Sequence, residues 1–141
     1  MARISNWPAA LTLFLQEKEH LPFQWGENDC CLFTCDWIAI LTGEYPEVAR
    51  SLRGTYHSAA EAAEVLATLG GVEAIASQYA ASKGWGVVSS PRLAQRGDIA
   101  TVKTEQGVAL GVVTGWRVAH PGTDGIVWTT LDEAITVWRI S

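Results

Sequence analysis

The residues best suited to chemistry lie in one short segment, where a cysteine directly follows two good helix-capping residues. Asn28 and Asp29 can both cap a helix, and residues 30–41 after them are apolar enough to form a buried one. Cys30 is therefore expected at or near the first helical position. There the free backbone N–H groups and the helix dipole favour a thiolate, which lowers the thiol pKa from its usual value of about 8.5. This placement is typical of a cysteine nucleophile.

A packing role is the alternative for Cys30, because free cysteine is among the most frequently buried residue types. The aromatic and flexible pair Trp25-Gly26 before the cap favours an accessible thiol instead. Trp25, Trp116 and Trp128 could line a groove beside Cys30. Packing in the core or at an interface explains each of these tryptophans equally well.

The three cysteines all lie between positions 30 and 35, and an odd number leaves at least one thiol free. A disulfide framework is therefore not expected. On a helix Cys31 and Cys35 would share a face, with Cys30 rotated by roughly 100° from Cys31, which disfavours a metal site. We expect neither a metal nor a cofactor.

A cysteine nucleophile needs a base, and the chain has three histidines. His120 could take the proton of Cys30 if its imidazole came within roughly 2.6–3.2 Å of the sulfur. His57 lies in a polar loop, where a solvated side chain is expected. His20 ends an amphipathic helix, where a cation favours the helix dipole. Asp98 follows a glycine at the start of a strand, so a local turn hydrogen bond is its expected role.

Capping and periodicity predict four helices in the first 83 residues, joined by polar segments. Residues 44–57 are expected to form a polar connection with a turn at Gly54-Thr55-Tyr56. The predicted helices are one capped by Asn6 with Pro8 in its first turn, one over residues 30–41 ended by Thr42-Gly43, one from the capping box Ser58-Ala59-Ala60-Glu61 to Gly70-Gly71, and one over residues 72–82.

From Gly84 onward, short β-branched runs alternate with turn residues, which predicts strands. Helices followed by a meander of strands indicate an α+β fold, and 141 residues suit a single domain over residues 1–141. Hairpin turns are expected at Glu105-Gln106-Gly107 and Thr114-Gly115. The predicted strands are residues 86–89, 98–103, 108–114, 116–120, 125–129 and 136–140.

The charge of the chain excludes some classes of partner. A net charge of −5, without a cluster of lysine and arginine, argues against nucleic-acid binding. No charged segment precedes a long apolar run with a small-residue cleavage site, and no run reaches the roughly 18 apolar residues of a membrane span. We therefore expect neither a secretion signal nor membrane insertion.

Three segments together resemble one known family. They are Phe23-Gln24-Trp25-Gly26 with Asp29-Cys30, then Arg96-Gly97-Asp98-Ile99, then Ala109-Leu110-Gly111-Val112-Val113. They look like the nucleophile loop, the Gly-Asp that opens the first core strand and the following strand of the NlpC-type cell-wall hydrolases. More narrowly, the loop, Thr42-Gly43 and Gly54-Thr55-Tyr56 look like a compact variant of that family found in phage tail genes.

The resemblance implies a papain-like fold, with an N-terminal nucleophile helix followed by an antiparallel sheet. It implies that Cys30 is the nucleophile and that Trp25, Asp29 and Asp98 line or support the substrate groove. Its catalytic histidine has no counterpart, because Ala109 stands at that position. His120, one strand later, lies near the position of the polar residue that normally orients the family's histidine.

Two hypotheses of different classes follow. In the first, Cys30 attacks an amide of the peptidoglycan stem peptide, His120 relays the proton and helix N–H groups stabilise the oxyanion. In the second, the chain is a catalytically degenerate component of a phage tail tip that binds other tail proteins. Both place the protein in the virion, or in the host cytoplasm during assembly.

Overall fold

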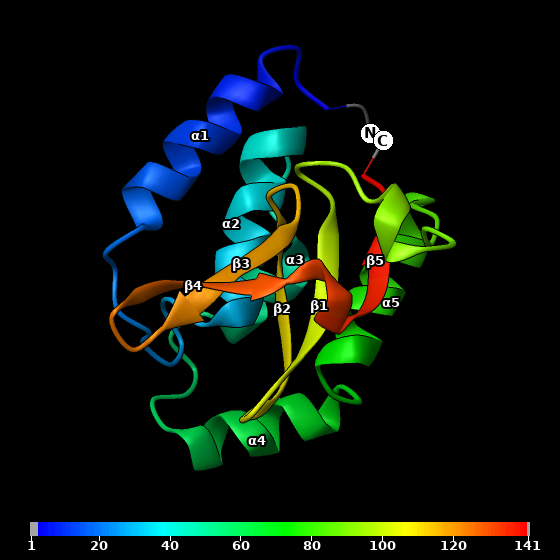
Figure 1. Ribbon diagram of the computed structural model, residues 1–141. Coiled ribbons are helices and arrows are strands. Elements are labelled where there is room, and N and C mark those ends of the chain that lie inside the picture. The colour runs from blue at the N-terminus through cyan, green and yellow to red at the C-terminus, as the bar shows by residue number, and fades with distance from the viewer. Residues whose placement is uncertain (1–2, 141) are drawn as a thin grey trace.

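The computed structural model describes residues 3–140, and in this range the helices precede a five-stranded sheet (Figure 1). In chain order the elements are α1 (Trp7–Lys18), α2 (Cys30–Thr42), α3 (Glu47–Leu52), α4 (Ala59–Thr68), α5 (Val72–Lys83), the 3-10 helix η1 (Pro91–Leu93), β1 (Ile99–Thr104), β2 (Gly107–Val113), β3 (Arg117–Gly122), β4 (Gly125–Thr130), the 3-10 helix η2 (Leu131–Glu133) and β5 (Ala134–Trp138).

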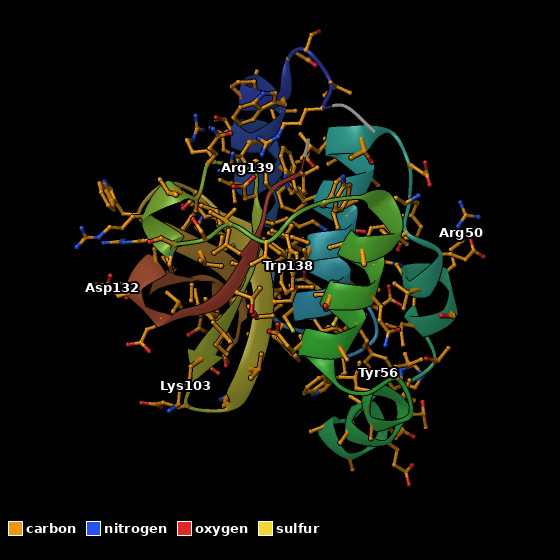
Figure 2. The ribbon with its side chains drawn as sticks, turned by 90° about the vertical axis from the view of Figure 1, so that its right-hand side faces the viewer. Arg50, Tyr56, Lys103, Asp132, Trp138 and Arg139 are labelled. Atoms are coloured by element: carbon orange, nitrogen blue, oxygen red, sulfur yellow. The ribbon has the colours of Figure 1, made fainter. Side chains whose placement is uncertain are left out.

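The sheet has the strand order β4-β3-β2-β1-β5, and every neighbouring pair is antiparallel. Tight turns join β1 to β4 as a meander, and β5 then returns to pair with β1. Figure 2 shows the sheet as one layer, with α2, α3 and α5 in a second layer beside it. The expected α+β class, with helices first and an antiparallel sheet after them, is confirmed.

Helix α2 lies at the centre of the fold because it is apolar on nearly all sides. Its residues Phe33 and Trp37 pack in a core between the helices and the sheet, together with Trp138 from β5, which Figure 2 labels near the middle of the molecule. Leu32 and Cys35 pack on the other side, in a cluster formed with α3 and α4. The helix is thus buried by elements from both halves of the chain.

The second face of the sheet carries its own apolar cluster. Val113 and Val118 pack there against Leu131 of η2, and Val88 and Ala94 lie at its margin. Because successive residues of a strand point to opposite faces, neighbouring positions of β2 and β3 belong to different clusters. This alternation decides which side chains can reach α2.

Several helix ends match the sequence pattern. Ser58 caps α4 by accepting a hydrogen bond from the N–H of Glu61 at 3.2 Å, and α2 ends at Gly43 in the left-handed conformation. Asn6 precedes α1 as predicted, but its side chain makes no capping hydrogen bond. The predicted polar connection over residues 44–57 was wrong in part, because the short helix α3 begins at Glu47, directly after Pro46.

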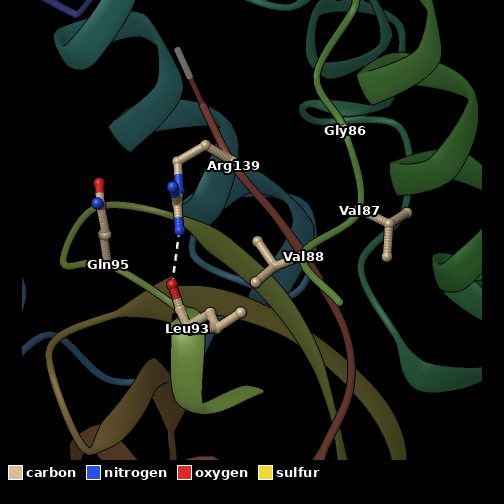
Figure 3. A pocket seen from close by; sticks show the side chains of 6 residues that line it. All are labelled: Gly86, Val87, Val88, Leu93, Gln95 and Arg139. Atoms are coloured by element: carbon tan, nitrogen blue, oxygen red, sulfur yellow. Dashed lines mark hydrogen bonds between the residues drawn. The ribbon is translucent and has the colours of Figure 1, made fainter. Parts of the chain in front are cut away.

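The predicted strand over residues 86–89 was wrong, because this segment makes only an isolated bridge to the end of β5. Val88 donates its N–H to the carbonyl of Val137 at 2.7 Å, and Arg139 donates its N–H to Gly86 at 3.0 Å. The segment therefore covers the outer edge of β5. A shallow groove lies beside it, lined by Gly86, Val87, Val88, Leu93, Gln95 and Arg139 (Figure 3).

Asp98 is fully buried and ties both ends of the described chain to the start of β1. Its carboxylate accepts hydrogen bonds from Arg3 at 2.6 Å, from Arg139 at 3.0 Å and from the N–H of Gln95 at 2.8 Å. Arg3 also donates to the carbonyl of Ile140 at 2.7 Å. The turn hydrogen bond predicted for Asp98 is present, and the two arginines make its role a structural one.

Replacing Asp98 tests this network. Asp98→Ala leaves two partly buried guanidinium groups without their carboxylate, so the free energy of unfolding should fall by about 3–5 kcal/mol. Urea unfolding followed by circular dichroism measures this change. Glu47→Ala is the control, because its 3.9 Å ion pair with Arg50 is solvent-exposed and should be worth less than about 1 kcal/mol. Equal midpoints for the two variants would contradict the assignment.

Candidate active site

Cys30 is the first residue of α2, as the sequence predicted. Asp29 has an extended backbone and caps the helix, with its Oδ1 accepting a hydrogen bond from the N–H of Leu32 at 3.0 Å. The Cys30 side chain is partly exposed, whereas Asp29 is buried. The cap therefore places an accessible thiol at the positive end of the helix dipole.

The second oxygen of Asp29 holds two loops in place. Oδ2 accepts hydrogen bonds from the N–H of Gly26 at 3.0 Å and from the hydroxyl of Tyr56 at 2.6 Å. Burial and the nearby Asp29 raise the pKa of Tyr56 far above its ordinary value, so the phenol stays protonated and donates. Tyr56 thereby fixes the residues after α3 beside the loop that leads into α2.

Trp25 supports this loop through aromatic contacts. Its ring meets Phe23 edge-on at a centroid distance of 4.6 Å and Tyr56 at 6.3 Å. Trp25 is partly buried and packs against the cluster that contains Leu32. The N–H of Phe23 bonds the carbonyl of Gly122 at 2.8 Å, which ties the loop to the end of β3.

Among the described residues, the groups that act on the sulfur of Cys30 include hydrogen-bond donors and no imidazole. Hydrogen bonding from the Cys31 thiol lowers the pKa of Cys30, and the backbone N–H groups of Leu110 and Cys31 act in the same direction, against the opposing effect of burial. Within residues 3–140, no hydrogen bond engages the backbone N–H of Cys30 itself. The structure thus supports the thiolate expected from the sequence.

The Leu110 N–H is available to the sulfur because the ladder between β2 and β3 stops early. The two strands pair only at Val112 with Ala119 and at Val113 with Val118. Continuing this register would place Leu110 opposite Pro121, which has no N–H to return a hydrogen bond. The first turn of α2 occupies the place where the two strands separate.

The other two cysteines differ from Cys30. Hydrogen bonding to Cys30, together with burial, raises the pKa of Cys31 well above its ordinary value. Burial raises the pKa of Cys35 to about 12. At neutral pH these two residues are thiols, so Cys30 is the one cysteine placed to act as a nucleophile.

His120 lies on the opposite face of the sheet from Cys30. Its neighbour Ala119 packs in the core beside α2, so strand alternation puts His120 on the far face with Val118. Its Nε2 lies 2.7 Å from the hydroxyl of Thr129, and the backbone of Pro121 hydrogen-bonds the ring as well. Burial lowers the pKa of His120, so the ring is neutral at pH 7. The structure does not bring this predicted base to the thiol.

Ala109 also points away from Cys30. It packs at the margin of the far-face cluster, whereas the next residue, Leu110, packs in the core beside α2. Asp98 lies two helical turns beyond Cys30, since the Trp37 indole bonds the carbonyl of Gly97 at 2.9 Å. The sequence-predicted site residues therefore divide into Cys30, Asp29 and Trp25 at one place, and Asp98 and His120 elsewhere.

Three contributors to the site were missed by sequence reasoning: Tyr56, the Cys31 thiol and the Leu110 N–H. Tyr56 was noted only as part of a turn, and no local pattern links it to Asp29. The pair Cys30-Cys31 was visible, and adjacent cysteines at a helix start are a signal that one thiol can donate to the other.

Two surface grooves in the described part of the chain, one beside Arg139 and one between α3 and α5, contain none of the residues around Cys30. Trp116 is 83% exposed at the turn between β2 and β3.

Among residues 3–140, no group of three or more His, Cys, Asp or Glu side chains is arranged to hold a metal ion. No helix in this range is long and apolar enough to span a membrane.

A pair of glycine substitutions tests how the loop before Cys30 is held. Gly26 and Gly43 both have a φ near +80°, but a Cβ at Gly26 would overlap the carbonyl of Tyr56, whereas at Gly43 it would meet nothing within 4 Å. Gly43→Ala should cost about 1–2 kcal/mol for the left-handed backbone alone. Gly26→Ala should cost at least about 2 kcal/mol more in urea unfolding. Equal losses of unfolding free energy in the two variants would show that the backbone at Gly26 is not packed tightly against the carbonyl of Tyr56.

The thiol pair is tested by the pH dependence of alkylation. Cys31→Ala removes the donor to Cys30, so the pKa of Cys30 should rise and its reaction with iodoacetamide at pH 7 should slow. Cys31→Ser is the matched control, because its hydroxyl can still donate and should keep the pKa closer to that of the unmodified protein. Identical pH profiles for all three proteins would contradict the role of Cys31.

The comparisons with known proteins identify a family without a described activity. A model described as "Domain of unknown function (DUF6950)" matches residues 2–140, nearly the whole chain. Neither the search of curated proteins nor the search of solved structures found a match. Since the match covers well over half of the chain, this protein belongs to the DUF6950 family.

Proposed function

We propose that this chain is a relative of the NlpC-type hydrolases that keeps the cysteine helix but lacks a catalytic base, and that it serves as a structural component of a phage tail tip. The observation that carries the proposal is the environment of Cys30. Donors from Leu110 and Cys31 surround its sulfur, while His120 lies on the other face of the sheet. Such a thiol is anchored in the fold without a partner for proton transfer.

The order of elements supports the papain-like, NlpC-type part of the proposal. A capped cysteine helix packs on an antiparallel sheet, with most of its sheet contacts made by β2 and β3. The loop from Phe23 to Gly26 leads into the cysteine helix, and Gly97-Asp98 directly precedes β1, which supports the resemblance. Asp98 is buried between two arginines, which supports a framework role for it over contact with a substrate.

The missing base weighs against hydrolysis. A positioned general base or acid contributes roughly 10²- to 10⁴-fold to a rate, and amide cleavage also needs a proton for the leaving amine. The Nε2 of His120 already meets the hydroxyl of Thr129 at 2.7 Å, on the other face of the sheet from Cys30. A structural role uses the same fold and needs no proton transfer at Cys30.

The exposed tryptophan Trp116 supports a protein-binding role in the virion. It projects from the turn between β2 and β3 with 83% of its surface exposed. Tryptophan is enriched at protein interfaces, and leaving its large apolar surface in water is unfavourable in free energy. Other tail proteins are the proposed partners.

The second candidate is a Cys30-dependent amidase of peptidoglycan stem peptides, and one observation favours it. The thiol is partly exposed with a lowered pKa, and the unpaired N–H of Cys30 could stabilise an oxyanion. In this mechanism the thiolate would attack the amide carbonyl, and water or a substrate group would have to protonate the leaving amine.

Peptidoglycan turnover separates the two candidates. Purified protein should release no new amino groups from peptidoglycan above the level given by Cys30→Ala, because no base assists the thiol. His120→Ala should have no effect either. Turnover that is lost in Cys30→Ala but retained in Cys31→Ser would establish the amidase and refute the structural proposal.

The structural role has its own readout in the phage that encodes the protein. Deleting the chain should block tail assembly, whereas Cys30→Ala should leave infectious particles at normal yield. The protein should also be found in purified tails by mass spectrometry. Its absence from tails would contradict the proposed place in the virion.

A further inference from the structure

The groove beside β5 combines apolar side chains with a charged one. Figure 3 shows Val88 and Leu93 directed toward the space between them, with Arg139 and Gln95 on its other sides. The groove has a volume of about 550 Å³, within the roughly 300–1,000 Å³ of ligand sites in proteins. Leu93 is 58% exposed although it is large and apolar. An apolar lining with a few polar groups is typical of a binding site.

Arg139 is held in place on two sides of its guanidinium. Its Nε donates to Asp98 at 3.0 Å, and its Nη2 donates to the carbonyl of Leu93 at 2.6 Å. Within residues 3–140, its third nitrogen, Nη1, makes no hydrogen bond. Arg3 shares the same carboxylate, so the three charged groups together keep a positive charge. A guanidinium that is already fixed loses little entropy when it binds an anion.

Two further arginines flank the groove. Arg92 belongs to η1 and directly precedes Leu93, and Arg96 directly follows Gln95. Both arginines are exposed. Neither makes an ion pair with any residue from 3 to 140, although the neighbouring η2 contains two carboxylates. Their charges are therefore available to a ligand.

The helical half of the chain treats its cations differently. Each lysine or arginine between positions 4 and 83 pairs with a carboxylate at 2.6 to 3.9 Å, namely Lys18, Arg50, Arg53 and Lys83. Lys103 and Arg117 are unpaired among the described residues, but each is the single lysine or arginine of its strand. A cluster of arginines on a chain with 15 acidic and 10 basic residues attracts anionic partners.

We propose that this groove binds an acidic segment of a partner protein. One carboxylate of the segment bonds Nη1 of Arg139, and an adjacent apolar side chain lies between Val88 and Leu93. Further carboxylates pair with Arg92 and Arg96, whose planar guanidinium groups match a carboxylate in geometry. The inference rests on the composition of the groove and does not depend on the proposed function.

The shape and lining of the groove favour a protein segment over other anions. Sites for small molecules enclose most of the ligand surface, whereas this groove is shallow. Single-stranded nucleic acids stack their bases on aromatic side chains, and none of the six residues that line this groove is aromatic. A peptide that carries both acidic and apolar residues uses the arginines and the apolar walls together.

Binding of labelled peptides tests the charge requirement. The probe is a pool of fluorescein-labelled octapeptides that alternate Glu or Asp with Leu, Ile, Val or Phe, titrated with the full chain and followed by fluorescence anisotropy. The pool should bind, and raising NaCl from about 50 to about 300 mM should weaken the binding, because salt screens exposed charges. A matched pool with Gln and Asn in place of the acids should bind at least about tenfold more weakly.

A pair of charge variants locates the contact. Arg92→Gln combined with Arg96→Gln should raise the dissociation constant of the acidic pool about three- to tenfold, because two exposed ion pairs are lost. Arg50→Gln combined with Lys103→Gln is the matched control, since it removes the same charge from surfaces that Figure 2 shows far from Arg139. The control should stay within about twofold of the unmodified protein.

The apolar contact has its own pair of variants. Leu93→Ser should weaken binding of the acidic pool at least about fivefold, because the apolar side chain of the peptide loses its neighbour. Leu13→Ser is the control, since Leu13 on α1 is 59% exposed and lies outside the groove. In NMR spectra of the isotope-labelled full chain, the acidic pool should shift the amide signals of Val88, Leu93 and Arg139.

Four outcomes would overturn the proposal. They are the absence of binding up to about millimolar protein, equal binding of the acidic and neutral pools, equal weakening by the groove variants and their controls, and tighter binding of single-stranded oligothymidine than of the acidic pool. The last outcome would make the groove a general polyanion site. NMR shifts confined to the groove between α3 and α5 would also contradict it.

Discussion

The site depends on one buried carboxylate, that of Asp29. It accepts hydrogen bonds from three different segments: the first turn of α2 at Leu32, the preceding loop at Gly26 and the residues after α3 at Tyr56. A buried charge is costly unless donors surround it, so the fold must hold all three segments in place together. The position of Cys30 follows from this arrangement, because the next residue after the cap can only be the first of the helix.

The chemistry open to that cysteine is set by strand parity. Leu110 faces the helix and Ala109 faces away, although they are adjacent in the chain. The same rule separates Ala119, beside α2, from His120. A shift of one residue in either strand would change which side chains surround the sulfur. The neighbours of Cys30 are therefore backbone N–H groups and a second thiol, which stabilise negative charge but do not accept a proton.

Local signals in the sequence were sufficient for much of the fold. Asp29 and Ser58 were recognised as caps because their hydrogen-bond partners lie three residues away, and the β1–β2 turn was recognised from Glu105-Gln106-Gly107. Nonlocal contacts were not predictable in this way. Tyr56 reaches Asp29 across 27 positions, and Arg3 reaches Asp98 across 95. The face occupied by His120 also depended on an exact register that strand propensity does not supply.

The bonds that Arg3 makes to Asp98 and Ile140 bring the two ends of the described chain to one point, although positions 3 and 140 are 137 residues apart. Closing so large a loop costs considerable chain entropy, so this contact is expected to form late in folding, after the local hairpins and helices. The geometry also makes the domain nearly circular in its connectivity. A short linker could join residue 140 to residue 3, and new ends could then be opened at an exposed turn such as Glu105-Gln106 without crossing the core.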